Sequence, residues 1–413
     1  MPGSATHMLV YSKNLFGESA APTAVPFHDM VCRMIEINTL DNTGSSPSNF
    51  AAYNGLLYFS ARDVTYGYEL WSFDDSTETL NLAASINPGG DSFPTDLIVY
   101  NGLLYFAADN GTIGRELWTY DDSPAVLTCV QDYYIGAAGS DPKFPIVYNY
   151  SGTDYLFFQA NDGSGGFELY EYDSTAPPAS YYDINGTGDS RPAYMTALGA
   201  DFYFQANDGL GTGEELWIYD TGGTPSRLTD ANPGINNFSP AYLYPFQGNL
   251  VFQANDGTSG IEFWQYVPGT GESLIADIAP GGLHSSPYGF HEYDNKLYFS
   301  ADDNTNGYEL WVYDPPAAPA MVNLNASGNA YPNSFVSYNG DLYFSASNGV
   351  NGQELWVYDG ATPITVGTNM RQACEINNAD SSYVNNLFVY NGRLYFSAND
   401  GTNGAELWVY YLK

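Results

Sequence analysis

The short motif Glu-Leu-Trp, or a close variant of it, occurs eight times along the chain, and no other sequence feature restricts the fold as strongly. Successive copies begin 45 to 52 residues apart. Their first residues are Glu69, Glu116, Glu168, Glu215, Glu262, Glu309, Glu354 and Glu406. A period of this length over 413 residues predicts one array of repeats rather than two or three separate domains.

Each repeat contains four short segments with the character of strands. Residues 96–100 form an apolar run that ends in Asn101-Gly102, and Asn-Gly between apolar runs is the strongest short signal of a hairpin. A second strand follows, then a hairpin rich in Asp, Asn and Gly, and then the strand that carries Glu-Leu-Trp. A fourth strand, such as residues 273–277, leads into a Pro-Gly loop. The sequence therefore predicts an all-β fold, a single eight-bladed β-propeller of four-stranded antiparallel blades.

An aromatic residue stands two positions after each repeated glutamate, and all seven tryptophans of the chain are placed this way. The eight aromatic residues are Trp71, Trp118, Tyr170, Trp217, Trp264, Trp311, Trp356 and Trp408. We expect these rings to dock each blade on its neighbour. Only 11 basic residues are present, so we expect the glutamates to accept hydrogen bonds from backbone N–H groups or tyrosine hydroxyls.

The two ends of the chain predict how the ring closes. The last repeat stops just after its third strand, whereas residues 30–37 form a strand without a repeat of its own. This strand aligns with the fourth strands elsewhere, so we expect it to complete the eighth blade and remove a free edge. In an alternative phase it is the innermost strand of the first blade. The predicted propeller spans residues 28–413, and residues 1–27 form a tail whose first eight residues resemble a cloning scar.

The charge of the chain excludes one class of partner. There are 47 acidic and 11 basic residues, a net charge of −36 at pH 7. A phosphate backbone needs a basic patch, and none is visible, so no nucleic-acid partner is expected. No apolar stretch is long enough for membrane insertion. A cation, a glycan or an extracellular protein suits this charge better. The oligomeric state stays open.

Three sequence features are informative about the compartment and about metal binding: the cysteines, the histidines and the sequons. Cys32, Cys129 and Cys374 are odd in number and far apart, which predicts no disulfide framework. The four histidines show no zinc-ligand spacing. Asn-X-Ser/Thr sequons favour an extracellular or cell-surface location. They begin at Asn110, Asn149, Asn185, Asn237 and Asn325.

The repeated motif resembles the ELWxxDGT repeat family. Residues 354–360 read Glu-Leu-Trp-Val-Tyr-Asp-Gly, and Ala361 takes the place of the final Thr. The resemblance covers nearly the whole chain and implies a propeller of the kind found in large secreted or surface-attached proteins, most of them without an assigned activity. A weaker likeness is to the tryptophan-docking motif of eight-bladed quinoprotein dehydrogenases, which Ala61, Asp63, Gly67 and Trp71 match. That likeness implies docked blades and no particular cofactor.

Loops two strands apart emerge on the same face of a propeller, so one face should gather many acidic side chains. We predict a binding face there, carried by hairpin aspartates, by acids at the ends of fourth strands and by one histidine. These residues are Asp63, Asp162, Asp208, Asp256, Asp303, Asp400, Asp183, Asp230, Asp277 and His284. Calcium is the one cofactor suggested, because Asp302, Asn304 and Asn306 copy the start of an EF-hand loop, although Tyr313 stands where that loop needs Glu.

Three functions follow from this pattern. We predict a non-catalytic extracellular or cell-surface binding propeller that uses the acidic face for a cation, glycan or protein ligand, and not an enzyme. One alternative is a structural spacer of an extracellular assembly. A second alternative is a propeller enzyme, such as a polysaccharide lyase or a quinoprotein-like oxidoreductase. The residues that break the repeat, and on which an enzyme could rely, are Lys143, Arg191, His284 and His291.

Overall fold

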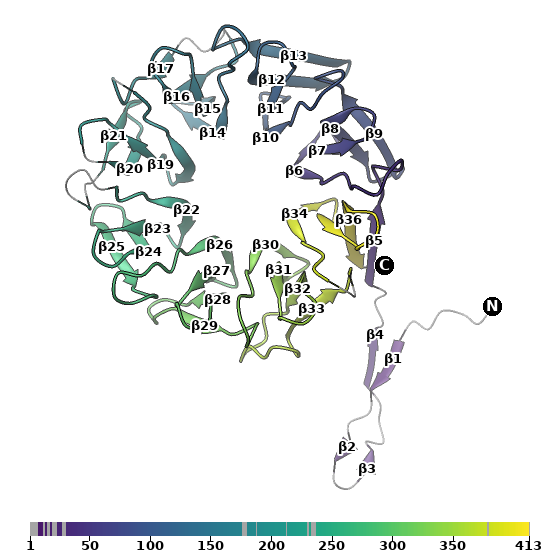
Figure 1. Ribbon diagram of the computed structural model, residues 1–413. Coiled ribbons are helices and arrows are strands. Elements are labelled where there is room, and N and C mark those ends of the chain that lie inside the picture. Colours follow the sequence, from purple (N-terminus) through teal and green to yellow (C-terminus); the bar gives the residue numbers. More distant parts are fainter. Residues whose placement is uncertain are drawn as a thin grey trace.

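The strands of the chain form a closed ring of sheets around one axis (Figure 1). The computed structural model describes residues 7–10, 13–14, 17–18, 23–26, 30–175, 180–186, 188–211, 213–228, 231–232, 237–377 and 380–412. Over these residues the fold is all-β, and eight antiparallel sheets of four strands surround the axis. The predicted eight-bladed β-propeller is confirmed. None of the described residues belongs to a helix long and apolar enough to cross a membrane.

The first four blades follow one another along the chain. Blade 1 contains β6 (Ser48–Tyr53), β7 (Leu56–Asp63), β8 (Gly67–Asp74) and β9 (Thr79–Ala84). Blade 2 contains β10 (Thr95–Tyr100), β11 (Leu103–Asp109), β12 (Arg115–Asp122) and β13 (Ala125–Gln131). Blade 3 contains β14 (Lys143–Tyr150), β15 (Thr153–Asn161), β16 (Phe167–Tyr172) and β17 (Ser180–Tyr182). Blade 4 contains β18 (Ala193–Leu198), β19 (Asp201–Asn207), β20 (Glu214–Tyr219) and β21 (Pro225–Arg227).

The remaining blades continue in the same order. Blade 5 contains β22 (Ala241–Phe246), β23 (Asn249–Asn255), β24 (Ile261–Val267) and β25 (Gly271–Ala276). Blade 6 contains β26 (Tyr288–Tyr293), β27 (Lys296–Asp302), β28 (Tyr308–Tyr313) and β29 (Ala320–Val322). Blade 7 contains β30 (Asn333–Tyr338), β31 (Asp341–Ser347), β32 (Gln353–Tyr358) and β33 (Met370–Cys374). Blade 8 contains β34 (Asn385–Tyr390), β35 (Arg393–Asn399), β36 (Ala405–Leu412) and β5 (Met30–Ile35).

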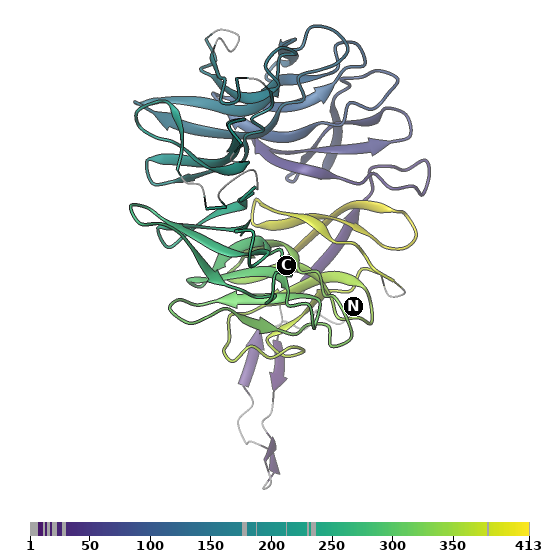
Figure 2. The same cartoon turned by 60° about the vertical axis from the view of Figure 1, so that its left-hand side comes forward.

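Blade 8 closes the ring with a strand from the other end of the chain. β5 pairs antiparallel with β36, from Leu407 opposite Ile35 to Leu412 opposite Met30. The predicted closure is confirmed, and the alternative phase is wrong. β1 (His7–Val10) pairs with β4 (Thr23–Pro26), and β2 (Lys13–Asn14) pairs with β3 (Gly17–Glu18). These four short strands lie outside the ring in both views (Figure 1, Figure 2).

The cysteine prediction is wrong, because Cys32 and Cys374 form a disulfide. Cys32 lies on the ring-closing strand β5, and Cys374 lies at the end of β33 in blade 7. Their separation of 342 residues in sequence hid the pairing, since the ring closure is what brings the two ends together. Cys129 is a free cysteine.

The apolar core lies between the blades, as separate clusters that each join two neighbouring blades. Trp71 of blade 1 packs with Tyr390 and Tyr395 of blade 8, and Trp118 of blade 2 packs with Tyr53 and Leu70 of blade 1. The other docking aromatics, Tyr170, Trp217, Trp264, Trp311, Trp356 and Trp408, are placed in the same way against the preceding blade. Burying these large rings between sheets stabilises the contact between neighbouring blades.

The repeated glutamates clamp the loops that lead from one blade to the next. Glu69 is fully buried, and its carboxylate accepts hydrogen bonds from the backbone N–H of Ile86 and Asn87, both at 2.9 Å, and from Ser92 Oγ at 2.6 Å. The same glutamate–serine pair recurs as Glu116–Ser140, Glu168–Ser190, Glu262–Ser285 and, across the ring closure, Glu406–Ser45. The predicted backbone donors are therefore present, but the hydroxyl belongs to serine and not to tyrosine.

Candidate functional site at the channel mouth

The innermost strand of every blade has the same backbone distortion near its start. These strands are β6, β10, β14, β18, β22, β26, β30 and β34, each the first strand of its sheet. Those that are labelled in Figure 1 lie nearest the ring axis. In each, the register with the second strand shifts just after the first residue. The second residue has a positive φ, between 55° and 70°, and these residues form what we call the bulge ring: Asn49, Asp96, Phe144, Tyr194, Tyr242, Gly289, Ser334 and Asn386.

Seven of the eight bulge-ring residues are not glycine, although a positive φ disfavours residues that carry a Cβ atom. Bulges re-aim side chains, and backbone outliers of this kind gather at functional sites. The bulge ring lies at the channel end next to the hairpin loops, because the clamped serine loops run directly into these strands. For example, Ser92 N–H donates to the carbonyl of Tyr68 at the hairpin end of blade 1.

The bulge ring is chemically divided into two arcs. The aromatic arc is Phe144, Tyr194 and Tyr242, continued by Tyr288, with successive ring centroids 5.6, 5.2 and 6.2 Å apart. The polar arc is Ser334, Asn386, Asn49 and Asp96. Within the polar arc, Asp96 N–H donates to Asn49 Oδ1 at 3.2 Å, and where the two arcs meet, Phe144 N–H donates to Asp96 Oδ1 at 3.3 Å. Side chains of the polar arc thus link blade 1 to blade 2 and blade 2 to blade 3.

A second ring of residues divides the channel in the same way. These residues lie on the second strands, directly opposite the first residue of each inner strand. Blades 3, 4 and 5 have Gln159, Gln205 and Gln253 there. Blades 6, 7, 8 and 1 have Ser300, Ser345, Ser397 and Ser60, and blade 2 has Ala107.

The three glutamines line a cavity of about 460 Å³, which we call the glutamine cavity. Phe144 and Tyr194 of the aromatic arc also line it, together with Lys143 and Arg191. Each cation is paired with an aspartate two residues earlier in the chain: Lys143 Nζ contacts Asp141 Oδ2, and Arg191 Nη2 lies 3.0 Å from Asp189 Oδ2. Cation, carboxylate, amide and aromatic groups therefore meet at one place in a protein with few bases.

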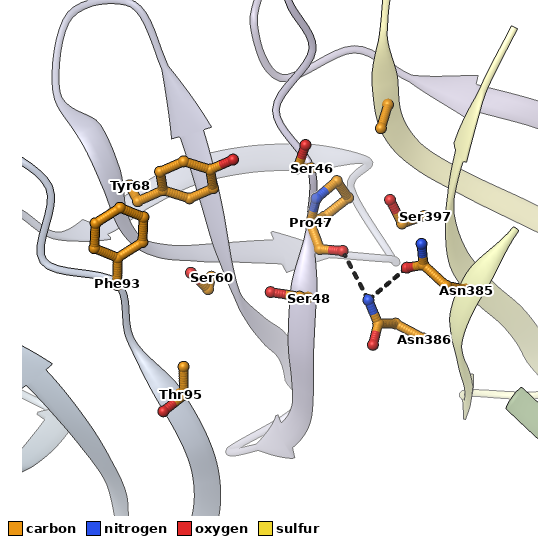
Figure 3. Close-up of a pocket in the computed structure, with 11 residues that line it drawn as sticks. Ser46, Pro47, Ser48, Ser60, Tyr68, Phe93, Thr95, Asn385, Asn386 and Ser397 are labelled. Atoms are coloured by element: carbon orange, nitrogen blue, oxygen red, sulfur yellow. Dashed lines mark hydrogen bonds between the residues drawn. The ribbon is translucent and has the colours of Figure 1, made fainter. Parts of the chain in front are cut away.

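A second cavity, of about 390 Å³, lies on the polar arc and is shown in Figure 3. Its hydroxyl groups include those of Ser48, Ser60 and Ser397, so we call it the serine cavity. Phe93 stacks on Tyr68 at one side, with ring centroids 4.9 Å apart. The lining comes from blades 8, 1 and 2, so the serine cavity spans the seam at which the two ends of the chain meet.

The hairpin aspartates predicted as a binding set shape their own turns. Asp63 Oδ1 accepts the backbone N–H of Thr65 at 3.0 Å and of Tyr66 at 2.6 Å. Turn N–H groups are accepted in the same way by Asp162, Asp208, Asp256, Asp303 and Asp400. Asp183 and Asp277 are exposed at the ends of their fourth strands, and Asp230 lies outside the described residues.

The residues of the proposed calcium site are also engaged locally. Asp302 Oδ1 accepts the N–H of Asn304 at 2.6 Å, and Asn306 Nδ2 donates to Asp303 Oδ2 at 2.7 Å. His284 Nδ1 accepts the N–H of Ile261 at 2.8 Å. In the part of the chain that the structure describes, no group of three or more His, Cys, Asp or Glu side chains is arranged to hold a metal ion.

Of the four residues that break the repeat, two meet and two do not. Lys143 and Arg191 line the glutamine cavity, and neither His284 nor His291 does. His291 lies on the inner strand β26, with Nε2 2.9 Å from Ser337 Oγ. Burial lowers the pKa of His291 below its usual range. The glutamines were missed, although the sequence marks them: three consecutive repeats read Gln-Ala-Asn-Asp where most others have Ser-Ala.

No protein-family model and no curated protein matches this chain. Solved structures do match it. A prolyl endopeptidase aligns with a TM-score of 0.51 and 12% identity, over 76% of this chain and 48% of that one. A puromycin-hydrolysing peptidase of Mycobacterium tuberculosis has a TM-score of 0.48 and 13% identity, over 76% and 52%. The acylaminoacyl peptidase of Pyrococcus horikoshii has a TM-score of 0.47 and 10% identity, over 88% and 59%.

The chain thus spans about half the length of each of these three solved structures. Likeness at such low identity shows the propeller fold. These three structures are peptidases, and they give no support to the prediction of a non-catalytic binding propeller. The main form of that prediction is therefore not kept, and the enzyme alternative is taken up under the proposed function. The expectation that the chain is not an enzyme is not supported either.

Proposed function

We propose that this chain is the propeller part of a peptide-processing enzyme and that its channel mouth binds the substrate. One observation carries the proposal: the bulge ring keeps one backbone geometry in eight blades while its side chains divide into an aromatic and a polar arc. A structural ring needs no such division. Ligand sites in symmetric scaffolds arise where the repeats differ, and here the differences gather at the axis.

Peptide is the substrate class that this mouth suits best. The side-chain amides of Gln205 and Gln253 can both donate and accept hydrogen bonds, as a peptide group does, and Tyr194 offers an apolar face beside them. The likeness to peptidases supports the same class. Because those proteins are about twice as long as the matched region, we propose that bond cleavage is carried out beyond the propeller residues described above.

The proposal is tested by titrating the protein with short peptides that are N-acetylated and C-amidated, using calorimetry for binding and mass spectrometry for cleavage. We expect saturable binding that Ala193→Trp abolishes, because Ala193 lines the glutamine cavity and a tryptophan would fill it. Val99→Trp, on an exposed residue of β10, is the matched control and should bind normally. An absence of saturable binding, or equal binding by both variants, would overturn the proposal.

We also infer that the protein works in an oxidising compartment, as the extracellular or cell-surface prediction requires. The disulfide between Cys32 and Cys374 supports this, because structural disulfides persist in such compartments. Alkylation of the protein directly on extraction should label Cys129 alone. Labelling of all three cysteines would contradict the inference. The resemblance to ELWxxDGT repeats stays a prediction.

A further inference from the structure

The three glutamines of the channel mouth occupy one register position on three successive blades. Gln159, Gln205 and Gln253 lie on β15, β19 and β23, each opposite the first residue of the neighbouring inner strand. Consecutive blades bring these side chains around one cavity, and all three line it. The site therefore offers a row of amides along one arc of the mouth.

Two of these amides are not used within the protein. Gln159 Nε2 donates to the carbonyl of Pro192 at 3.1 Å, whereas Gln205 and Gln253 have no hydrogen-bond partner among the described residues. Gln205 is 8% exposed, and it lines the cavity together with Gln253. An amide that lines a cavity and is not bonded within the protein can donate to and accept from a ligand that enters.

The charges around the cavity select against a strongly charged ligand. Lys143 and Arg191 are each balanced by an aspartate, and Glu214 adds one further carboxylate at the lining. Asp141 also lies 3.4 Å from Arg115 Nε. The local balance is close to neutral in a protein whose net charge is −36, so neither a cation nor an anion gains much there.

We propose that the glutamine cavity recognises the main chain of an extended peptide, with the amides of Gln205 and Gln253 exchanging hydrogen bonds with its peptide groups. This inference rests on the proposed function and adds that the peptide groups of the substrate are what the site recognises. Tyr194 and Phe144 then contact the peptide side chains through their rings. Recognition of the main chain predicts broad sequence tolerance together with strong dependence on the peptide N–H and C=O groups.

The test replaces one peptide group of the ligand with an ester. Acetyl-tetraalanine amide is compared by calorimetry with the same molecule in which a central N–H is an ester oxygen. We expect the ester to bind wild-type protein about tenfold more weakly, because it cannot donate to a glutamine Oε1. Gln205→Leu should bind both ligands equally and weakly. Ser345→Ala, at the same register position in blade 7 and in the lining of neither cavity, is the matched control and should behave as the wild type.

The outcomes separate this inference from the proposed function. If the wild type binds amide and ester equally and Gln205→Leu binds as the wild type does, main-chain recognition is overturned while peptide binding stands. If neither ligand binds at all, both proposals fall. Circular dichroism melting of Gln205→Leu, with Gln205→Asn as a second variant, shows whether any loss comes from unfolding. A loss of the ester–amide difference in both folded variants supports the inference.

Discussion

The glutamine cavity and the serine cavity lie at the same end of the same channel and are built on the same backbone, yet their chemistry differs. The first is lined by three amides, two cations and two rings of the aromatic arc, and these groups come from consecutive blades. The second has hydroxyls and amides and spans the seam between the chain ends (Figure 3). The repeat therefore fixes where the side chains point, and the sequence of each blade decides what they can bind.

The two cavities also differ in how their blades are held together. The blades around the glutamine cavity are joined by continuous chain, so no closure is needed there. The serine cavity depends on β5, which is held by pairing with β36, by the disulfide to blade 7 and by an ion pair at 3.0 Å between Arg33 and Glu78 of blade 1. A site that must keep its shape is better placed away from such a seam, which favours the glutamine cavity as the substrate site.

The largest effect is expected from removing the disulfide at the seam. Cys32→Ser removes a link between residues 342 apart, and the loss of so long a cross-link should lower the free energy of unfolding by about 2–5 kcal/mol. Chemical denaturation measures this loss, and hydrogen exchange locates it. We expect residues around the serine cavity to lose protection first, while blades 3 to 5 stay protected.

The matched control for Cys32→Ser is Cys129→Ser, which removes the free cysteine of β13. It should leave stability and exchange nearly unchanged. Uniform loss of protection around the whole ring in Cys32→Ser would contradict the distinction between seam and continuous blades.

The next largest effect concerns pH: the free energy of unfolding should increase as the pH falls. Burial raises the pKa of Glu168, in blade 3, and of Glu309, in blade 6, to about 7, from about 4.5 in an unfolded chain. The folded state then holds these protons more tightly, so the stability they contribute is complete below pH 4.5 and is lost as pH rises to about 7. We expect each group to contribute on the order of 1–3 kcal/mol between these limits.

Thermal melting between pH 8 and pH 5 measures this dependence, and the melting temperature should rise as the pH falls. Glu168→Gln should flatten the curve. Burial raises the pKa of Glu406 at the seam as well, although Ser45 Oγ and the N–H of Ile37 oppose the shift. A melting temperature that falls between pH 8 and pH 5 would contradict the assignment.

The fold could be predicted from the sequence because its determinants are local and repeated. Asn101-Gly102 marks a turn wherever it stands, and Trp118 marks a docking face, so eight copies gave the number of blades. The closure by β5 followed from one leftover strand and one missing strand. The disulfide between Cys32 and Cys374 did not follow, because it depends on how two blades sit beside each other in space.

The site could be predicted only in part. Lys143 and Arg191 were found because they break the repeat, and both line the glutamine cavity. The hairpin acids, such as Asp256, were conspicuous by number, but they hold their own turns. The bulge ring was missed, since residues as different as Asn49 and Tyr194 share a backbone conformation that no single residue type announces.

A smaller effect is expected from removing the serine hydroxyl that bonds to a repeated glutamate, once in each of the two regions. Ser45 Oγ donates to Glu406 at the seam, and Ser190 Oγ donates to Glu168 beside the glutamine cavity, both at 2.6 Å. Removing a hydrogen bond to a buried carboxylate should cost about 1.5–3 kcal/mol in either Ser45→Ala or Ser190→Ala. We expect similar losses on denaturation, but only Ser45→Ala should increase exchange across the seam. Equal exchange in both variants would remove the mechanical difference between the regions.

The smallest effect tests whether the two aromatic positions are equivalent for a ligand. Tyr194 and Phe93 both have a positive φ and both line a cavity of the channel mouth, one in each region. Tyr194→Ala should weaken peptide binding about tenfold, because it removes the ring that contacts the bound side chains. Phe93→Ala should change it by less than about twofold, since that ring stacks on Tyr68 in the other cavity. If Phe93→Ala caused the larger loss of binding, the peptide would occupy the serine cavity. The substrate site would then include the seam, contrary to the expectation that it lies away from the seam.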